Sequence, residues 1–100
     1  MNILVVKNKK VEIRKQNGAL IRVIGNGDAV FAEFNLDQTL IIITTTKGKV
    51  ELRKENGAFI RFICNENAIN ARWYGSEIAI NTNKGKTELR KQNGSFIRNF

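Results

Sequence analysis

The chain has 100 residues, of which 42% are hydrophobic and 8% aromatic, which suffices for the core of one folded domain and not for two. Seventeen Lys and Arg against nine Asp and Glu give a formal charge of +8, which indicates an acidic partner such as nucleic acid, protein or lipid headgroups. Without histidine, and with Cys64 as the single cysteine, the chain cannot form an internal disulfide, a histidine metal site or a Ser-His or Cys-His catalytic pair. We therefore expect no enzyme, no metal and no cofactor.

The N-terminal segment MNILVVKNKK lacks a basic region ahead of its apolar residues, so it does not have the pattern of a signal peptide. The longest aliphatic run, at 40–43, is much shorter than a membrane span. We expect a soluble, cytoplasmic protein with no membrane insertion.

A threefold repeat is the most informative feature of the sequence. Its copies are VEIRKQNGALIR at 11–22, VELRKENGAFIR at 50–61 and TELRKQNGSFIR at 87–98. The repeat divides a single domain, 1–100, into a partial unit at 1–28 and two full units at 29–66 and 67–100.

Each unit consists of short β-branched and aromatic runs, broken by Asn-Gly, Lys-Gly or Gly-Ser, and none keeps a helical apolar period. The predicted strands of the partial unit are 2–6, 10–15 and 19–24. Those of the second unit are 30–34, 40–45, 49–54 and 58–63, and those of the third are 69–73, 78–82, 86–91 and 95–100. The sequence therefore predicts an all-β protein of antiparallel four-stranded sheets, in which the first unit has one strand fewer.

Turn composition predicts how neighbouring strands pair. For the Asn-Gly turns we expect three-residue loops with Gly18, Gly57 and Gly94 in the left-handed conformation. This register pairs Leu52 with Ile60 and Glu51 with Arg61, and likewise in the other units, so that Glu–Arg salt bridges form across the strands. For the Lys-Gly turns, and for the corresponding turn of the first unit, we expect two-residue loops, which place the following residues opposite each other: Ile43 and Leu52, Leu4 and Ile13, and Ile80 and Leu89.

Both faces of the predicted sheets carry apolar residues, because Ile42, Phe59 and Phe96 lie opposite the main apolar face. Such sheets must be covered on both sides.

The unit AVFAEFNLDQTLIIITTTKGKVELRKENGAFIRFI resembles a WD-type repeat, and AINARWYGSEIAINTNKGKTELRKQNGSFIRNF follows the same pattern. The resemblance covers about two and two-thirds repeats, without the Gly-His and Trp-Asp signatures of that family. It implies blades of a β-propeller and a rigid, non-enzymatic binding platform.

A closed propeller has about four to eight blades, more than this chain supplies. We therefore expect a homo-oligomer, a dimer or trimer whose blades complete a ring. A β-trefoil is the alternative fold, since it also has three repeats but closes as a monomer, and it would favour a sugar-binding lectin.

The Lys-rich turns should lie on one edge of the sheets, because alternate turns of a meander share an edge. The candidate polyanion-binding residues are Lys9, Lys10, Lys47, Lys49, Lys84 and Lys86. We expect the Arg-Lys pairs that begin at Arg14, Arg53 and Arg90 to be solvated strand residues. Tyr74 is the candidate surface aromatic, whereas we expect Trp73 and Cys64 to be packed inside.

These features favour a non-catalytic scaffold that binds a protein partner. The alternative is binding of nucleic acid or another polyanion through the lysine-rich turns, which salt would weaken steeply.

Overall fold

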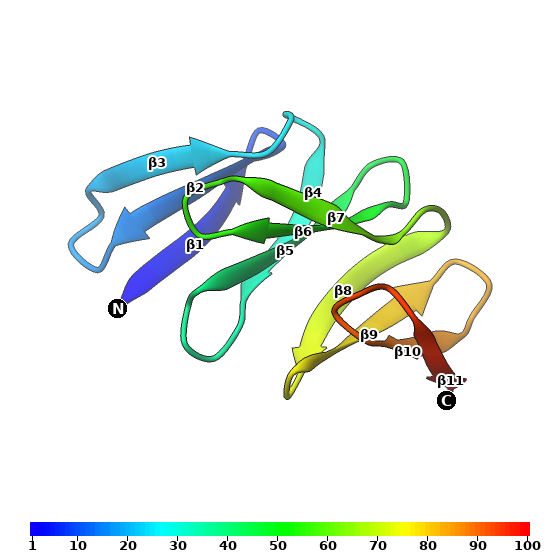
Figure 1. The fold of residues 1–100 in the computed structure, drawn as a ribbon. Coiled ribbons are helices and arrows are strands. Elements are labelled where there is room, and N and C mark those ends of the chain that lie inside the picture. The colour runs from blue at the N-terminus through cyan, green and yellow to red at the C-terminus, as the bar shows by residue number, and fades with distance from the viewer.

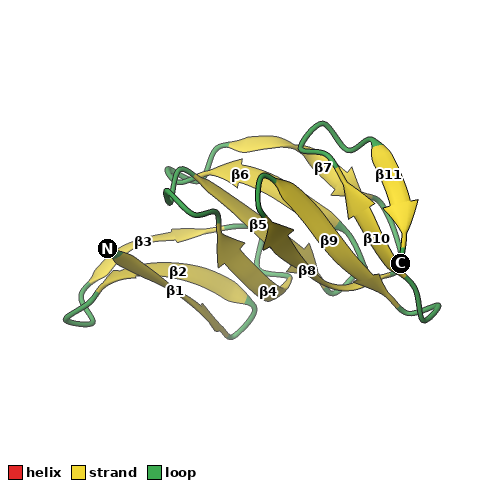
Figure 2. Cartoon of the chain, turned by 90° about the horizontal axis from the view of Figure 1, so that it is seen from below, coloured by secondary structure: helices red, strands yellow, loops and turns green.

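The computed structural model describes residues 1–100 as eleven strands in three antiparallel sheets, without any helix (Figures 1 and 2). Sheet 1 contains β1 (Asn2–Lys7), β2 (Lys10–Lys15) and β3 (Leu20–Ile24). Sheet 2 contains β4 (Ala29–Phe34), β5 (Leu40–Thr45), β6 (Val50–Lys54) and β7 (Phe59–Cys64). Sheet 3 contains β8 (Ala68–Tyr74), β9 (Glu77–Thr82), β10 (Thr87–Arg90) and β11 (Phe96–Asn99). All the predicted strands are confirmed, because every boundary lies within one residue of its expected place.

Each sheet is a meander in which consecutive strands are neighbours, and no strand pairs with a strand of another sheet. The chain therefore forms no closed barrel, and the β-trefoil alternative is wrong. Since the structure contains no helix, it has none that is long and apolar enough to cross a membrane.

The sheets follow one another in chain order, so that sheet 2 lies between sheets 1 and 3 (Figure 1). The core between sheets 1 and 2 consists of Val11, Ile13, Ile24, Ala29, Ile41 and Ile43. The core between sheets 2 and 3 consists of Ile42, Val50, Leu52, Ile63, Cys64, Ala68, Ala71, Ile78 and Ile80. Both faces of sheet 2 are thus buried, as predicted. The predicted face of each residue is wrong, however, because Ile42 lies on the face of Leu52, Ile43 lies on the other face, and Phe59 is 48% exposed.

The Asn-Gly turns have the predicted three-residue loop. In sheet 2, the Gly57 amide donates to the Lys54 carbonyl and the Lys54 amide donates to the Ala58 carbonyl, both at 2.9 Å. Gly57 has a φ of 94°, and the glycines of the other two turns are also left-handed, at 91° and 90°. This is a tight turn followed by a glycine bulge.

The pairing predicted beyond these turns is wrong, because each outer strand contains a second bulge. Arg53 pairs with Phe59, but Leu52 then pairs with Arg61, so that Ile60 is the extra residue. The same shift occurs between Ile13 and Arg14 in sheet 1 and between Leu89 and Arg90 in sheet 3. Ile60 packs against the core between sheets 2 and 3, and burial of this apolar side chain accounts for the bulge.

The Lys-Gly turns also differ from the prediction. In sheet 2 the loop has three residues, since the Thr45 amide donates to the Lys49 carbonyl and the Gly48 amide to the Thr45 carbonyl. Leu52 therefore pairs with Ile42 and not with Ile43, and in sheet 3 Leu89 pairs with Ala79 and not with Ile80. Only sheet 1 has the two-residue loop, where Asn8 and Lys9 both have positive φ and Leu4 pairs with Ile13 as predicted.

Candidate functional site

The lysine-rich turns and the connections between sheets lie at the same end of the strands, which forms one edge of the molecule. Backbone hydrogen bonds link these turns and connections in series. The donor amides and acceptor carbonyls are Ala29 to Lys9 (2.9 Å), Thr46 to Asp28 (2.8 Å), Ala68 to Gly48 (3.0 Å) and Asn83 to Asn67 (2.9 Å). We call this edge the turn edge. It is the edge on which the sequence placed the candidate lysines, and the hydrogen bonds hold its turns in fixed positions relative to one another.

The six candidate lysines do not form one cluster. All are exposed except Lys49, which is half-buried, with its Nζ 4.9 Å from the centre of the Phe62 ring. Lys84 and Lys86 differ from the others because they line a cleft between sheets 2 and 3. The structure therefore singles out these two lysines as a local site.

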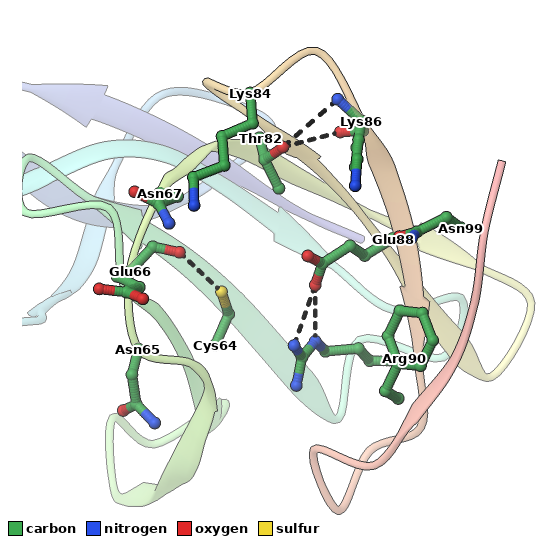
Figure 3. A pocket seen from close by; sticks show the side chains of 11 residues that line it. Cys64, Asn65, Glu66, Asn67, Thr82, Lys84, Lys86, Glu88, Arg90 and Asn99 are labelled. Carbon is green, nitrogen blue, oxygen red and sulfur yellow. Dashed lines mark hydrogen bonds and ion pairs between the residues drawn. The ribbon is translucent and has the colours of Figure 1, made fainter.

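The cleft has a volume of about 410 Å³ and lies between the β7–β8 connection and strands β10 and β11 (Figure 3). Its lining residues are Cys64, Asn65, Glu66, Asn67, Thr82, Lys84, Lys86, Glu88, Arg90, Phe96 and Asn99. In Figure 3, Lys84 and Lys86 enter it from the β9–β10 turn, with the Glu88–Arg90 pair on the opposite side. Arg90 is bonded to Glu88 and to the Gly94 carbonyl, whereas neither Lys84 nor Lys86 forms an ion pair, so these two ammonium groups can bind a ligand with oxygen acceptors.

A substitution within the repeat explains why this cleft is open. Asn99 pairs with Glu88 as Phe62 pairs with Glu51, so the two residues occupy the same position in their sheets. In sheet 2 the Phe62 ring covers Lys49, whereas in sheet 3 the smaller, polar Asn99 leaves Lys86 uncovered. The sequence showed the change from Phe to Asn, but only the register placed it beside a lysine.

The predicted cross-strand salt bridges are wrong. Each glutamate instead pairs with the arginine two residues later on its own strand: Glu12 with Arg14, Glu51 with Arg53 and Glu88 with Arg90. The second bulge causes this, because it places an apolar residue or asparagine opposite each glutamate. Residues two apart on a strand point to the same face, so the same-strand pair needs no particular register.

The arginines of the Arg-Lys series are turn-holding residues and not solvated strand residues. Arg53 is only 9% exposed; its Nε donates to Glu51 at 2.8 Å and its Nη1 to the Gly57 carbonyl at 2.8 Å. Arg14 and Arg90 make the equivalent bonds to their own glutamate and turn glycine. The lysine that follows each arginine is exposed, as predicted.

A second, more apolar cleft of about 570 Å³ lies on the opposite edge, between the β4–β5 loop and the β8–β9 turn. Trp73 lines it and packs against the core between sheets 2 and 3, and its indole Nε1 donates to the Glu33 carbonyl at 3.1 Å. Next to it, Leu36 is 96% exposed and Tyr74 is 63% exposed. Trp73 thus packs between sheets as predicted, although it is only half-buried, and Tyr74 is exposed as predicted.

Glu33 and Asp37 also belong to this edge, and the sequence did not single out Glu33. The Glu33 carboxylate accepts from the Arg72 Nε and the Trp73 amide, which joins sheet 2 to sheet 3. The Thr39 hydroxyl donates to Asp37 at 2.6 Å, and this bond, followed by the Thr39 amide, lowers the pKa of the Asp37 carboxyl. Cys64 is buried in the core, with its thiol against the Glu66 carbonyl.

No protein-family model matches this chain, and no curated protein matches it at a significant level. The structure also contains no group of His, Cys, Asp and Glu side chains that could hold a metal ion.

Proposed function

We propose that the protein is a non-catalytic, propeller-type scaffold that binds a protein partner and completes its ring of blades with further copies of itself. The observation that carries this proposal is the repeated stacking of meander sheets in chain order, with linking turns held in series along one edge. The WD-like pattern of the repeat supports it. In a ring, the turns of all copies would surround a common axis and offer a rigid rim to a partner.

The mass of the native assembly tests the closure. Native mass spectrometry and sedimentation at micromolar concentration should give a dimer or a trimer. Its thermal midpoint should rise with protein concentration, because dissociation and unfolding are linked. A sharp monomer mass with a melt independent of concentration would overturn the closure.

Crosslinking tests the protein partner. A photoreactive residue at Leu36, beside the apolar cleft, or at Lys84, on the turn edge, should give one defined adduct in an extract of cells that contain the protein. The same group at Lys54, an exposed end of β6, is the control position. Equal labelling from all three positions would argue against a defined binding edge.

Binding of a polyanion through the turn edge is the second candidate, and the polar cleft lined by Lys84 and Lys86 favours it. Replacement of all six candidate lysines by glutamine should abolish retention on a phosphate-rich matrix at low salt, with the oligomer mass unchanged. Replacement of Lys15, Lys54 and Lys91, which lie outside the turn edge, by glutamine is the control, and it is compared with replacement of the three turn-edge lysines Lys47, Lys84 and Lys86, which removes the same charge. If the parent is not retained, or the six-lysine variant is retained equally, this candidate fails.

A further inference from the structure

The two contacts between sheets within the chain are built alike. We call the side of a sheet that faces the next sheet its forward face, and the side that faces the preceding sheet its rear face. The forward faces contribute Val11, Ile13 and Ile24 in sheet 1 and, at the same repeat positions, Val50, Leu52 and Ile63 in sheet 2. The rear faces contribute Ala29, Ile41 and Ile43 in sheet 2 and Ala68, Ile78 and Ile80 in sheet 3. The chain thus shows twice how a forward face fits a rear face.

The rear face of sheet 1 carries the same kind of side chain but is uncovered. Ile3 pairs with Arg14 as Ile41 pairs with Arg53, so Ile3 and Ile41 hold the same position in their sheets. Ile3 is 47% exposed, whereas Ile41 is fully buried. Val5 lies two residues further along the same face of β1.

The Asn-Gly turn of sheet 1 also lacks a neighbour that the other two turns have. A Cβ on Gly57 would meet the Ile24 Cγ2 of sheet 1 at 2.9 Å, and one on Gly94 would lie 3.6 Å from the Ile63 carbonyl of sheet 2. Nothing lies within 4 Å of the corresponding point on Gly18. The end of an outer strand covers this place in sheets 2 and 3.

The forward face of sheet 3 offers the matching groups. Arg98 has the repeat position of Arg61, whose Nη1 lies 3.5 Å from the Gln92 carbonyl in the turn of the following sheet. Arg98 is exposed and has no hydrogen-bond partner for its side chain. Phe100, at the repeat position of Ile63, is 67% exposed.

We infer that the forward face of sheet 3 in one copy packs on the rear face of sheet 1 in a second copy. This inference rests on the proposed closure by further copies and identifies the two surfaces that meet. Leu89 is already only 5% exposed within one chain, so Thr87 and Phe100 are the side chains that cover Ile3 and Val5 of the second copy, and Arg98 faces its turn at Gln16. A joint between different surfaces continues head to tail until the ring closes.

Two variants, each blocked on one face, test this joint. Ile3→Asp puts a charge on the rear face, and Arg98→Glu reverses one on the forward face. Both side chains are exposed, so each variant should fold and remain monomeric where the parent assembles. When mixed, they should form a 1:1 complex, because each variant keeps the face that the other has lost. Lys54→Glu makes the same change of charge as Arg98→Glu on the middle sheet, and it should leave the parent mass unchanged.

A charge exchange tests the residue contact itself. Gln16 corresponds to Glu55, which lines a cleft together with Arg22. Gln16→Glu should therefore strengthen assembly, because it places a carboxylate near Arg98 of the neighbouring copy, as Glu55 lies near Arg22. Arg98→Glu should raise the dissociation constant of the assembly by about tenfold or more, so that it is monomeric at concentrations where the parent assembles, and Gln16→Arg in that variant should lower the constant again.

The outcomes separate this inference from the proposed function. A monomeric parent overturns both. A parent that assembles while Ile3→Asp and Arg98→Glu assemble equally well overturns the inference alone. So does a mixture of two monomeric variants that yields no complex, because a head-to-tail joint requires one.

Discussion

The turn glycines offer a measurement in which backbone strain and contact between sheets can be separated. Gly18 and Gly57 occupy equivalent positions in the Asn-Gly turns of sheets 1 and 2, with nearly the same φ, 91° and 94°. A Cβ in the left-handed region costs about 1–2 kcal/mol, so both Gly18→Ala and Gly57→Ala should lose that amount of unfolding free energy. They differ in what the new methyl group would touch.

The methyl group of Gly57→Ala would lie 2.9 Å from the Ile24 Cγ2, closer than van der Waals contact allows. Ile24 is 5% exposed and β-branched, so its Cγ2 has little freedom to move. Overpacking of this kind costs about 1–3 kcal/mol, which adds to the backbone strain. We expect Gly57→Ala to lose about 2–5 kcal/mol in total and Gly18→Ala about 1–2 kcal/mol.

Urea unfolding of the two variants at one fixed protein concentration measures this difference, because linked dissociation would otherwise shift the midpoints. Gly94→Ala is the internal control: its nearest neighbour would be 3.6 Å away, an ordinary contact, so it should behave like Gly18→Ala. Ile24→Ala removes the clashing atom. The double variant Gly57→Ala with Ile24→Ala should therefore lose less unfolding free energy than the two single variants lose together. Equal losses for all three glycines would refute the contact, and no loss at any would refute the left-handed turn.

Further predictions concern buried polar groups. Arg53→Ala should cost about 3–5 kcal/mol because it leaves Glu51, which is 2% exposed, without a partner. Arg14→Ala, at the equivalent pair with side chains 31% and 16% exposed, should cost only about 1 kcal/mol for its ion pair, and equal losses in thermal melts would contradict the burial argument. Thr44→Val should raise the unfolding free energy by roughly 1 kcal/mol, since the Thr44 Oγ1 is buried without a hydrogen-bond partner. Thr45→Val is its control and should be destabilising, because the Thr45 hydroxyl accepts from the Lys49 amide at 3.2 Å.

The strands were predictable because their signals are local. Alternating apolar residues and punctuating glycines identify a strand and a turn within about ten residues, and the threefold repeat supplied the same evidence three times. The left-handed turn at Gly57 follows from Asn-Gly chemistry alone, and the sandwiching of sheet 2 follows from isoleucines on both faces of β5. The edge that carries the lysine-rich turns follows from meander topology.

Register was decided by the tertiary structure. Whether Ile60 or Arg61 lies opposite Leu52 depends on a second bulge, which exists because the core between two sheets takes in Ile60. No pattern within one hairpin shows what a neighbouring sheet will cover. The same reason explains the ion pairs, since Glu51 turns to Arg53 only because the shifted register places Phe62 opposite it.

The polar cleft shows both contributions in one place. The sequence supplied Lys84 and Lys86 and the replacement of phenylalanine by Asn99. Lys84, Lys86 and Arg90 belong to the β9–β10 hairpin, and only the packing of sheet 3 on sheet 2 brought Asn65 of the β7–β8 connection to the same hollow. Local propensity thus determined the strands and turns of this protein, whereas burial between sheets determined the registers, the ion pairs and the site.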